Sequence, residues 1–335
     1  MKFGLIPVED SRYYAQSLQQ VELAEELGFD SVWLEEHHGT SGHYHPSPFI
    51  YLAGYATRTK RITLGTNIAI LPLYHPTRVA EDVAQLDVMS NGRVILGAAI
   101  GYRVQEFDAF QTPLHGRGAQ FVEMLKLIKL LWTEENVTVA GPRYPLNEFT
   151  LEPRPVQRPR PPIWLGGWGK LAIKRAAVLG DAWLPGPTAN LAKLLEAQGR
   201  FHAHLAELDI DPSSRARPLT RDVVIASSAT LAEERAQRYL LPAYRDEYGS
   251  WDHPLIGTSD ATATDVLSEL RRDRFIIGDP QQVLEQIAQF EAQFGMDHLI
   301  CRLHFPGMPP QMVTEAVQLI GKEVIPAYPR RGSND

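Results

Sequence analysis

Four of the chain's 11 histidines fall within nine residues, directly after a short apolar run at residues 31–34. The polar residues that follow this run are Glu35, Glu36, His37, His38, His43 and His45. Imidazole transfers protons near neutral pH and donates hydrogen bonds to developing anions. In parallel α/β barrel enzymes, catalytic groups gather just beyond the carboxyl ends of the strands. The pattern therefore predicts a catalytic role for His37.

A metal site and a polar loop without function are the two other interpretations of this cluster. Helical zinc motifs place two histidines four residues apart on one face, and the cluster lacks that geometry, so we expect no metal. A position at a strand end argues against an inert loop for His37. The same argument against an inert loop is weaker for His43 and His45, because they lie further from the strand end.

A glycine-rich loop follows another apolar run, at residues 163–165, and leads directly into a predicted helix. The loop consists of Gly166, Gly167, Trp168, Gly169 and Lys170. Glycines let backbone N–H groups approach an anion, a helix N-terminus favours negative charge, and Lys170 adds a positive charge. The loop matches neither the Walker pattern nor the dinucleotide-binding fingerprint. We expect a phosphate site here, and the alternative is a tight strand-to-helix turn.

Further candidates follow the apolar run at residues 93–100. They are Tyr102, Arg103, Glu106 and, at the start of the next predicted helix, Arg117. We expect Arg117 to contact a phosphate, and an ion pair with a surface acid is the alternative.

Three other residues of reactive or aromatic type have a structural interpretation as well. Trp168 and Trp183 can flank an aromatic ring system, although large aromatic side chains more often belong to the core. Cys301 lies inside an apolar run and is expected to be buried and unreactive.

Short apolar runs alternate with amphipathic stretches of helical period along the whole chain, a pattern typical of a parallel sheet with crossover helices. The expected strands cover residues 3–8, 31–34, 62–71, 93–100, 163–165, 182–184, 223–226 and 298–302. Eight strands alternating with helices predict an α/β fold, a single (β/α)8 TIM barrel, with one domain over residues 1–330. No internal repeat of fixed period is visible.

Two segments interrupt this alternation. Gly141-Pro142 indicates a small hairpin at about residues 135–150, inserted outside the barrel, and a proline-rich connector follows it. The stretch at about residues 244–274 is polar, aromatic and long for a barrel loop. We interpret it as a mobile lid, inserted near the seventh strand.

Composition excludes several classes of protein. The formal net charge of -7 without a clustered basic face argues against nucleic-acid binding. No stretch has the roughly 18 apolar residues of a membrane span, and the first residues are too short an apolar run for a signal peptide. A single cysteine allows no internal disulfide. We therefore expect a soluble, cytoplasmic protein.

The chain resembles bacterial luciferase and its flavin-dependent monooxygenase relatives. The resemblance rests on residues 28–38 (GFDSVWLEEHH), 64–67 (LGTN), 71–72 (LP), 75–76 (HP), 80–83 (AEDV), 86–93 (LDVMSNGR) and 278–280 (GDP). It spans nearly the whole chain and is weakest at residues 189–273. No block is specific alone, but together they are.

The resemblance implies a barrel with reduced flavin mononucleotide (FMN) in its mouth. His37 matches the family's catalytic histidine, and Asn67-Ile68 matches a position where relatives hold a non-prolyl cis peptide under the flavin ring. The phosphate is expected on residues 167–171 with Lys170, joined by Arg117 and Tyr102. The chain departs from luciferase in having Ile100 and Ala99 at positions of an arginine and a reactive cysteine. These departures argue against light emission and leave oxygen chemistry open.

Three functions are compatible with these observations. The first is a two-component monooxygenase that takes reduced FMN from a separate flavin reductase and uses O2 to oxygenate a small organic substrate. The second is hydride transfer with the deazaflavin cofactor, which other branches of the family use. The third is a non-catalytic barrel that binds flavin. A homodimer is expected from the resemblance and from the frequency of symmetric pairs.

Overall fold

A computed structural model of the chain describes residues 1–40, 44–244, 271 and 273–328. Its centre is a curled sheet with the strand order β11-β10-β12-β1-β2-β3-β5-β8-β9, in which every pairing is parallel; β4 adds to β5. The strands are β1 Lys2–Ile6, β2 Ser31–Leu34, β3 Thr63–Thr66, β4 Ala69–Ile70, β5 Val94–Ala99, β8 Ile163–Gly166, β9 Ala182–Leu184, β10 Pro218–Ile225, β11 Ile276–Gly278 and β12 His298–Arg302.

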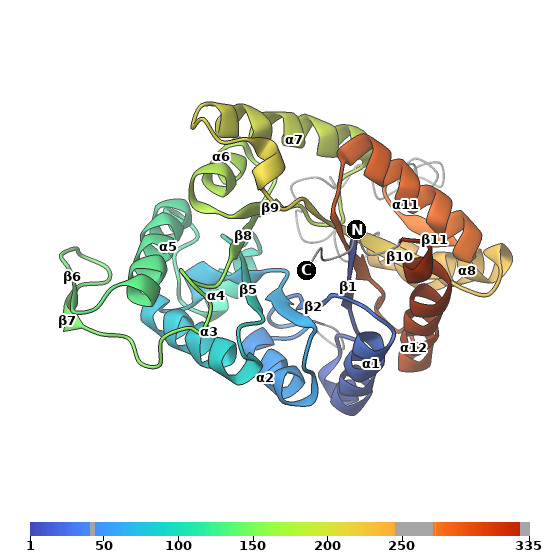
Figure 1. The fold of residues 1–335 in the computed structure, drawn as a ribbon, viewed down its shortest axis with the longest axis horizontal. Helices are drawn as coiled ribbons and strands as arrows, with labels where there is room; N and C mark the ends of the chain where they lie inside the picture. The colour runs from blue at the N-terminus through green and yellow to red at the C-terminus, as the bar shows by residue number, and fades with distance from the viewer. Residues whose placement is uncertain (41–43, 245–270, 272, 329–335) are drawn as a thin grey trace, which may run out of the picture.

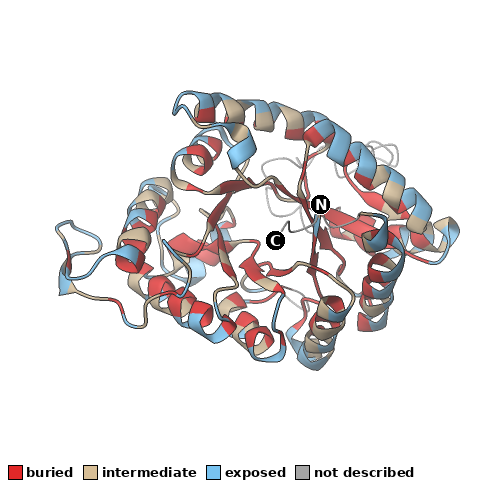
Figure 2. Cartoon of the chain, in the orientation of Figure 1, coloured by how far each residue is buried: buried red, intermediate tan, exposed pale blue. Residues whose placement is uncertain are grey.

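Helices surround this sheet on the outside (Figure 1). They are α1 Tyr14–Glu26, α2 Pro48–Arg58, α3 Pro76–Ser90, α4 Val104–Ala109, α5 Arg117–Thr133, α6 Lys170–Leu179, α7 Leu191–Ala206, α8 Ala229–Arg235, α9 Leu241–Ala243, α11 Pro280–Phe294 and α12 Pro310–Leu319. Figure 2 shows that their inner faces are buried and their outer faces exposed. The sheet therefore has a core on both of its surfaces, as parallel sheets require.

Helix α11 illustrates how the sequence sets these elements. Asp279 caps its N-terminus in a capping box with Gln282, and Gly295 ends it in a left-handed conformation. The buried side chains Val283, Ile287, Phe290 and Phe294 recur every three or four residues and so form one face. The helix begins, ends and faces the sheet as its sequence pattern predicts.

Two tryptophans fill the interior of the curled sheet. The rings of Trp33 and Trp164 stack with centroids 5.0 Å apart, and both are buried. A Cβ atom on Gly65 would lie 2.3 Å from the ring of Trp33, so only glycine leaves room for the indole. The centre of the curled sheet is therefore filled by these two rings and is a packed core rather than a pore.

All eight expected strands are present, but the seventh is longer than predicted. Residues 223–226 were expected to form it, whereas β10 begins five residues earlier, at Pro218. The additional residues include Arg221 and Asp222, which are charged but fully buried. Because charged residues interrupt the apolar run, the hydrophobic pattern did not predict this part of the strand. Beyond β9, the carbonyl of Pro185 accepts a hydrogen bond of 3.3 Å from the N–H of Thr220 on β10.

The expected hairpin is confirmed outside the sheet. It consists of β6 (Val137–Val139) and β7 (Leu146–Phe149), which pair antiparallel and project away from the helices (Figure 1). The lid expected at residues 244–274 lies outside the described residues, except for residues 244, 271, 273 and 274. Within the described ranges, no helix combines the length and apolar character needed to cross a membrane.

Candidate active site

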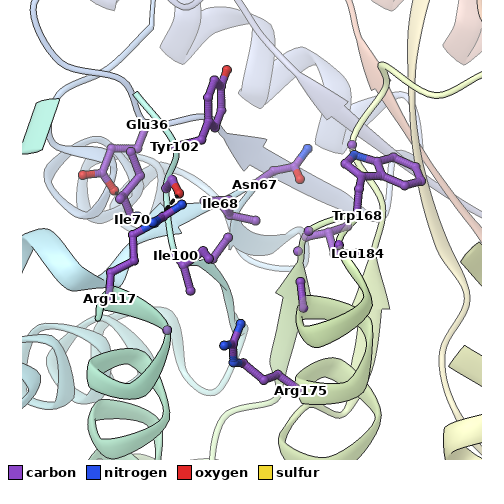
Figure 3. Close-up of a pocket in the computed structure, with 18 of the residues that line it drawn as sticks. Glu36, Asn67, Ile68, Ile70, Ile100, Tyr102, Arg117, Trp168, Arg175 and Leu184 are labelled. Atoms are coloured by element: carbon purple, nitrogen blue, oxygen red, sulfur yellow. Dashed lines mark hydrogen bonds between the residues drawn. The ribbon is translucent and has the colours of Figure 1, made fainter. Parts of the chain in front are cut away.

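A cavity of about 610 Å³ opens at the carboxyl ends of the strands, bounded by the loops after β2, β5, β8 and β9 and by the starts of α5 and α6. Ten of the residues predicted for the site line it, namely His37, Asn67, Ile68, Tyr102, Arg117, Gly166, Gly167, Trp168, Gly169 and Lys170. Figure 3 shows how side chains from distant parts of the chain face this one space. The fold therefore brings into one pocket residues that the sequence pattern had located after separate strands.

His37 is held by a buried carboxylate. Its Nδ1 lies 2.8 Å from Oε1 of Glu106, which is 1% exposed and lies on α4. The same oxygen accepts hydrogen bonds from the backbone N–H of His38, at 3.0 Å, and from the guanidinium of Arg103, at 2.8 Å. The contact directs the Nδ1 proton of His37 to Glu106, so Nε2 is the ring nitrogen that can serve the pocket. We call His37 and Glu106 the proton wall.

Glu106 stays ionised in this environment. Burial alone would raise the pKa of its carboxyl, but the hydrogen bonds from His37 and His38 and the charge of Arg103 outweigh it and lower the pKa. Arg103, one of the further candidates from the sequence, does not line the cavity. It is buried against this carboxylate and the carbonyl of His38. Its role is to hold Glu106.

Glu36 acts as a structural carboxylate at the edge of the pocket. It accepts hydrogen bonds from His38 Nε2 at 2.8 Å, from the hydroxyl of Tyr74 at 2.8 Å and from the backbone N–H of Ile70 at 2.9 Å. These contacts tie the loop after β2 to β4, so Glu36 fixes the position of its neighbour His37.

The other histidines of the cluster do not share the position of His37. His45 is fully buried, and its ring stacks on Tyr51 with centroids 3.8 Å apart. Burial lowers the pKa of His45 to about 4, so it is neutral at pH 7. His43 lies outside the described residues. Within the part of the chain that the structure describes, no three His, Cys, Asp or Glu side chains gather as a metal-binding set.

The floor of the pocket is apolar and contains the expected non-prolyl cis peptide between Asn67 and Ile68. The N–H of Asn67 donates to the carbonyl of Leu34 at 2.7 Å, and its side-chain amide donates to Thr220 Oγ1 at 3.0 Å. These bonds fix the loop to β2 and β10. Ile68, Ile100 and Leu184 then present hydrocarbon to the cavity (Figure 3).

Three cationic side chains lie on another wall, and we call Arg117, Lys170 and Arg175 the cationic cradle. Arg117 and Lys170 are the first residues of α5 and α6, so two helix N-termini border this wall. Figure 3 shows Arg117 and Arg175 approaching the pocket from these two helices. Positive charge and N-terminal N–H groups together favour an anion such as phosphate.

Arg117 makes no ion pair among the described residues, so the alternative of a surface salt bridge is not observed. Its guanidinium donates to the carbonyls of Gly101, at 3.1 Å, and Leu114, at 2.9 Å. Burial first, and then the neighbouring charge of Arg175, lower the pKa of Arg117. Two like charges thus face each other in the cradle, and an anion between them would relieve the repulsion.

Arg175 is the site residue that the sequence did not reveal. An arginine within a helix resembles any surface cation, and only the packing of α6 beside α5 directs it to the pocket. A Cβ on Gly118 would lie 2.4 Å from Nη2 of Arg175, so the glycine leaves the space in which the guanidinium lies. Gly118, one residue after Arg117, is the only local signal.

Trp183 was predicted to flank a ring system, but it does not line the cavity. Its indole N–H donates to the carbonyl of Gly167 at 3.0 Å, and its ring contacts Trp168 edge-on, with centroids 5.4 Å apart. Trp183 thus packs against the side of Trp168 and lies outside the cavity lining.

Cys301 is buried as expected, and burial raises the pKa of its thiol to about 12, so it is unreactive.

The residues present fit a flavin. A flavin combines a planar apolar ring system with a phosphate at the end of a flexible chain. The pocket offers an apolar floor, a cationic cradle built on two helix N-termini and a histidine held by a carboxylate. A Cβ on Gly167, whose φ is +121°, would lie 2.7 Å from Cβ of Ala172, so the loop before α6 depends on a glycine there.

Comparisons with known proteins agree with this geometry. The sequence profile of the family described as luciferase-like monooxygenase matches residues 3–298. The oxygenase component of the flavin-dependent trigonelline monooxygenase of Acinetobacter baylyi is 26% identical over 339 residues, which cover 94% of this chain and 90% of that protein.

A second relative is the F420-dependent glucose-6-phosphate dehydrogenase of Amycolatopsis mediterranei. It is 33% identical over 301 residues, covering 85% of this chain and 86% of that protein. Among solved structures, a monooxygenase from Streptomyces bottropensis superposes with a TM-score of 0.85 at 24% identity, covering 98% of this chain and 100% of that one. The relatives thus include both a flavin-dependent and an F420-dependent enzyme.

Proposed function

The chain belongs to the luciferase-like monooxygenase family, and we propose that it is the oxygenase of a two-component system. A separate flavin reductase supplies reduced FMN, and the protein uses it with O2 to oxygenate a small organic substrate. The observation that carries this proposal is one pocket that joins the proton wall to the cationic cradle across an apolar floor. The match to a relative named as the oxygenase component of a flavin-dependent monooxygenase supports it.

The side chains divide the work between them. Bound reduced FMN would supply the electrons and the reaction with O2. Arg117 and Arg175 would hold the phosphate, and the floor at Asn67 and Ile68 would fix the plane of the ring. His37 would move a proton at Nε2 while Glu106 holds Nδ1. The apolar side chains around the floor would exclude water, which strengthens electrostatic contacts in the pocket.

We interpret the curled sheet as a (β/α)8 barrel. The hydrogen bond from Thr220 to Pro185 links the start of β10 to the chain just beyond β9, where such a barrel has to close. In a closed barrel the pocket lies at the carboxyl ends of the strands, where barrel enzymes bind their substrates.

Hydride transfer with a deazaflavin is the second candidate. Three cationic side chains exceed what one phosphate needs, and a deazaflavin with carboxylates along its tail would use the surplus. The identity of 33% with an F420-dependent enzyme also favours it. FMN has priority because the family profile and the relative matched over 94% of this chain are both named as monooxygenases.

Parallel anaerobic titrations with reduced FMN and reduced F420, followed by rapid mixing with O2, test these candidates. Tight binding of FMN and a slowed, protein-dependent oxidation would support the monooxygenase. Preference for F420 without an oxygen reaction would support hydride transfer. Binding of reduced FMN that leaves its oxidation by O2 unchanged would support a non-catalytic flavin carrier. If neither cofactor binds, all three functions are wrong.

We also propose that the protein forms a homodimer. Helices α2 and α3 are neighbours, and they expose the apolar side chains Ile50, Val88 and Met89. Apolar side chains on adjacent helices are suited to a symmetric contact. Light scattering after size-exclusion chromatography should give twice the chain mass of 37.5 kDa, and Ile50→Glu should shift it toward the monomer.

A further inference from the structure

Another group of titratable side chains is buried beside the pocket, and the proposed function does not use it. These residues follow β1 and β2 or lie on β10 and β12: Glu9, Glu35, Asp222 and Arg302. Each is at most 8% exposed. We call them the buried acid cluster. Ionisable groups are rarely buried unless they are paired or functional.

Glu9 and Glu35 contact each other at the ends of adjacent strands. The backbone N–H of Glu35 donates to Oε1 of Glu9 at 2.7 Å. Arg302 reaches Oε2 of Glu35 at 3.3 Å and also donates to Asp222. The second oxygen of Asp222 accepts from the hydroxyl of Tyr244. Arg302 therefore compensates Glu35 and Asp222, and within the described ranges no ion pair joins Glu9 to a cation.

The neighbouring histidines do not supply the missing positive charge. His304 accepts a hydrogen bond at Nδ1 from the N–H of Glu9, at 3.4 Å, and its Nε2 lies 3.3 Å from the carbonyl of Met308. Nδ1 thus accepts and Nε2 donates, which is the hydrogen-bonding pattern of a neutral imidazole. His45, with a pKa of about 4, is neutral as well. Nearby Asp10 is already paired with Arg12.

Among the residues that the structure describes, three buried carboxyls thus share one guanidinium, and on this charge balance the cluster holds a proton at neutral pH. Glu9 is its most favourable site. Burial, and then the charge of Glu35, raise the pKa of Glu9 well above its ordinary value, and Arg302 offsets this only in part. Burial also raises the pKa of Glu35, whereas the charges of Arg302 and His37 lower it. The proton therefore rests on Glu9 and can be shared with Glu35.

The pair lies between two cavities. Glu35 lines the main pocket together with His37. Glu9 lines a small cavity with Tyr44 and His304, whose volume of about 10 Å³ is room for about one water molecule. Tyr44 also packs its ring edge-on against His37, with centroids 4.7 Å apart. The carboxyl groups of Glu9 and Glu35 therefore connect the small cavity to the main pocket.

We propose that Glu9 and Glu35 form a proton relay that restores the proton of His37 at Nε2. Glu9 gives its proton to the carboxylate of Glu35, and Glu35 passes it through a water of the main pocket to His37. A proton from the solvent, passed on by a water in the small cavity, then restores the carboxylic acid of Glu9, so no net charge accumulates. Glu9 and Glu35 are positioning and relay residues rather than catalytic residues. The inference rests on the proposed function only in the use that His37 makes of the proton.

Infrared spectroscopy of the protein without cofactor tests the stored proton. The wild type should show, at pH 7, the carbonyl stretch of a protonated buried carboxyl, and Glu9→Gln should remove it. Asp10→Asn is the matched control, because Asp10 is equally buried but its ion pair with Arg12 contributes to a lowered pKa. It should leave the band unchanged. Absence of the band in the wild type, or its persistence in Glu9→Gln, would overturn the relay.

Histidine NMR of the same proteins tests the connection to His37. The His37 signal, assigned with His37→Asn, should shift its titration midpoint in both Glu9→Gln and Glu35→Gln and should keep it in Asp10→Asn. An unchanged midpoint in both relay variants would sink the proposal even if flavin binds and turns over. Conversely, a shifted midpoint in a protein that binds no flavin would keep the relay and reject the proposed function.

Unfolding measured against pH separates the relay from a merely structural role. A raised pKa means that the folded state keeps a proton which the unfolded state loses, so wild-type stability should fall as the pH rises through the folded pKa of Glu9. Glu9→Gln stays neutral and should lack this alkaline loss. A parallel decline in the two proteins would contradict a stored proton.

Discussion

The proton wall and the cationic cradle are built in different ways although they line the same pocket. His37 depends on a carboxylate that is 1% exposed and that receives three hydrogen bonds at one oxygen. Arg117, by contrast, is partly exposed, and its hydrogen bonds to described residues go to backbone carbonyls. Lys170 is exposed at the start of its helix. One wall is a coupled network, and the other is a set of separate charges.

This difference indicates how each wall should respond to substitution. In a buried network the loss of one partner leaves another group unsatisfied, so effects are large and not additive. Separate charges around an anion act through distance and screening, so effects are smaller and depend on salt. Binding and turnover should therefore respond to different residues.

Replacing His37 should have the largest effect. His37→Asn removes the group that moves the proton, so turnover should fall about a hundredfold while reduced-flavin affinity changes less than about twofold. Anaerobic titration and steady-state kinetics measure the two quantities. His75→Asn, an exposed histidine at the start of α3, is the control and should change neither. A loss of binding in His37→Asn would mean that the two walls are not separate.

Glu106→Gln should have the next largest effect, about tenfold on turnover, because the amide no longer compensates Arg103 and holds His37 less firmly. The pKa of Glu106 is lowered from 4.5, so its stabilising charge is fully present above that pH and is lost as the pH falls through the folded pKa. The deficit in unfolding free energy of Glu106→Gln should therefore be greatest near pH 7 and shrink below about pH 4. A deficit that is constant with pH would contradict an ionised Glu106.

Arg175→Ala should weaken flavin binding about tenfold, the scale of one charge-assisted hydrogen bond, and leave the turnover of the saturated enzyme nearly unchanged. Gly118→Ala tests the same contact without removing the charge. Its methyl group would displace the flexible end of Arg175, so binding should weaken about threefold at unchanged thermal stability. If Gly118→Ala binds like the wild type, Arg175 does not contact the ligand where it now lies.

Lys170→Ala should have the smallest effect, about twofold on the dissociation constant at physiological salt, because the side chain is exposed. The effect should increase at low ionic strength, where screening is weaker. Titrations at two salt concentrations measure it. A salt-independent loss would indicate a direct, desolvated contact and would move Lys170 from the outer to the inner part of the cradle.

Most of the strands and the glycine-rich loop before α6 could be predicted, because the sequence patterns that indicate them are local. Apolar runs mark buried strands, and Gly166 and Gly167 mark a turn where the backbone must approach a helix N-terminus. β10 was predicted only in part, because Arg221 and Asp222 look like surface residues until their buried environment is known. Charge misleads a pattern-based prediction where a buried side chain finds its partner elsewhere in the chain.

The sequence by itself determined the alternation of strands and helices, the strand ends that carry His37 and the glycine loop, and the family to which these motifs point. Only the tertiary structure decided which of these residues meet. The pairing of His37 with Glu106 spans 69 residues and that of Glu9 with Glu35 spans 26, and Arg175 reaches the pocket because α6 packs beside α5. Local hydrophobic patterns indicate whether each segment is a helix or a strand. The pairing and curvature of the sheet, which depend on the whole chain, set the distances between the elements.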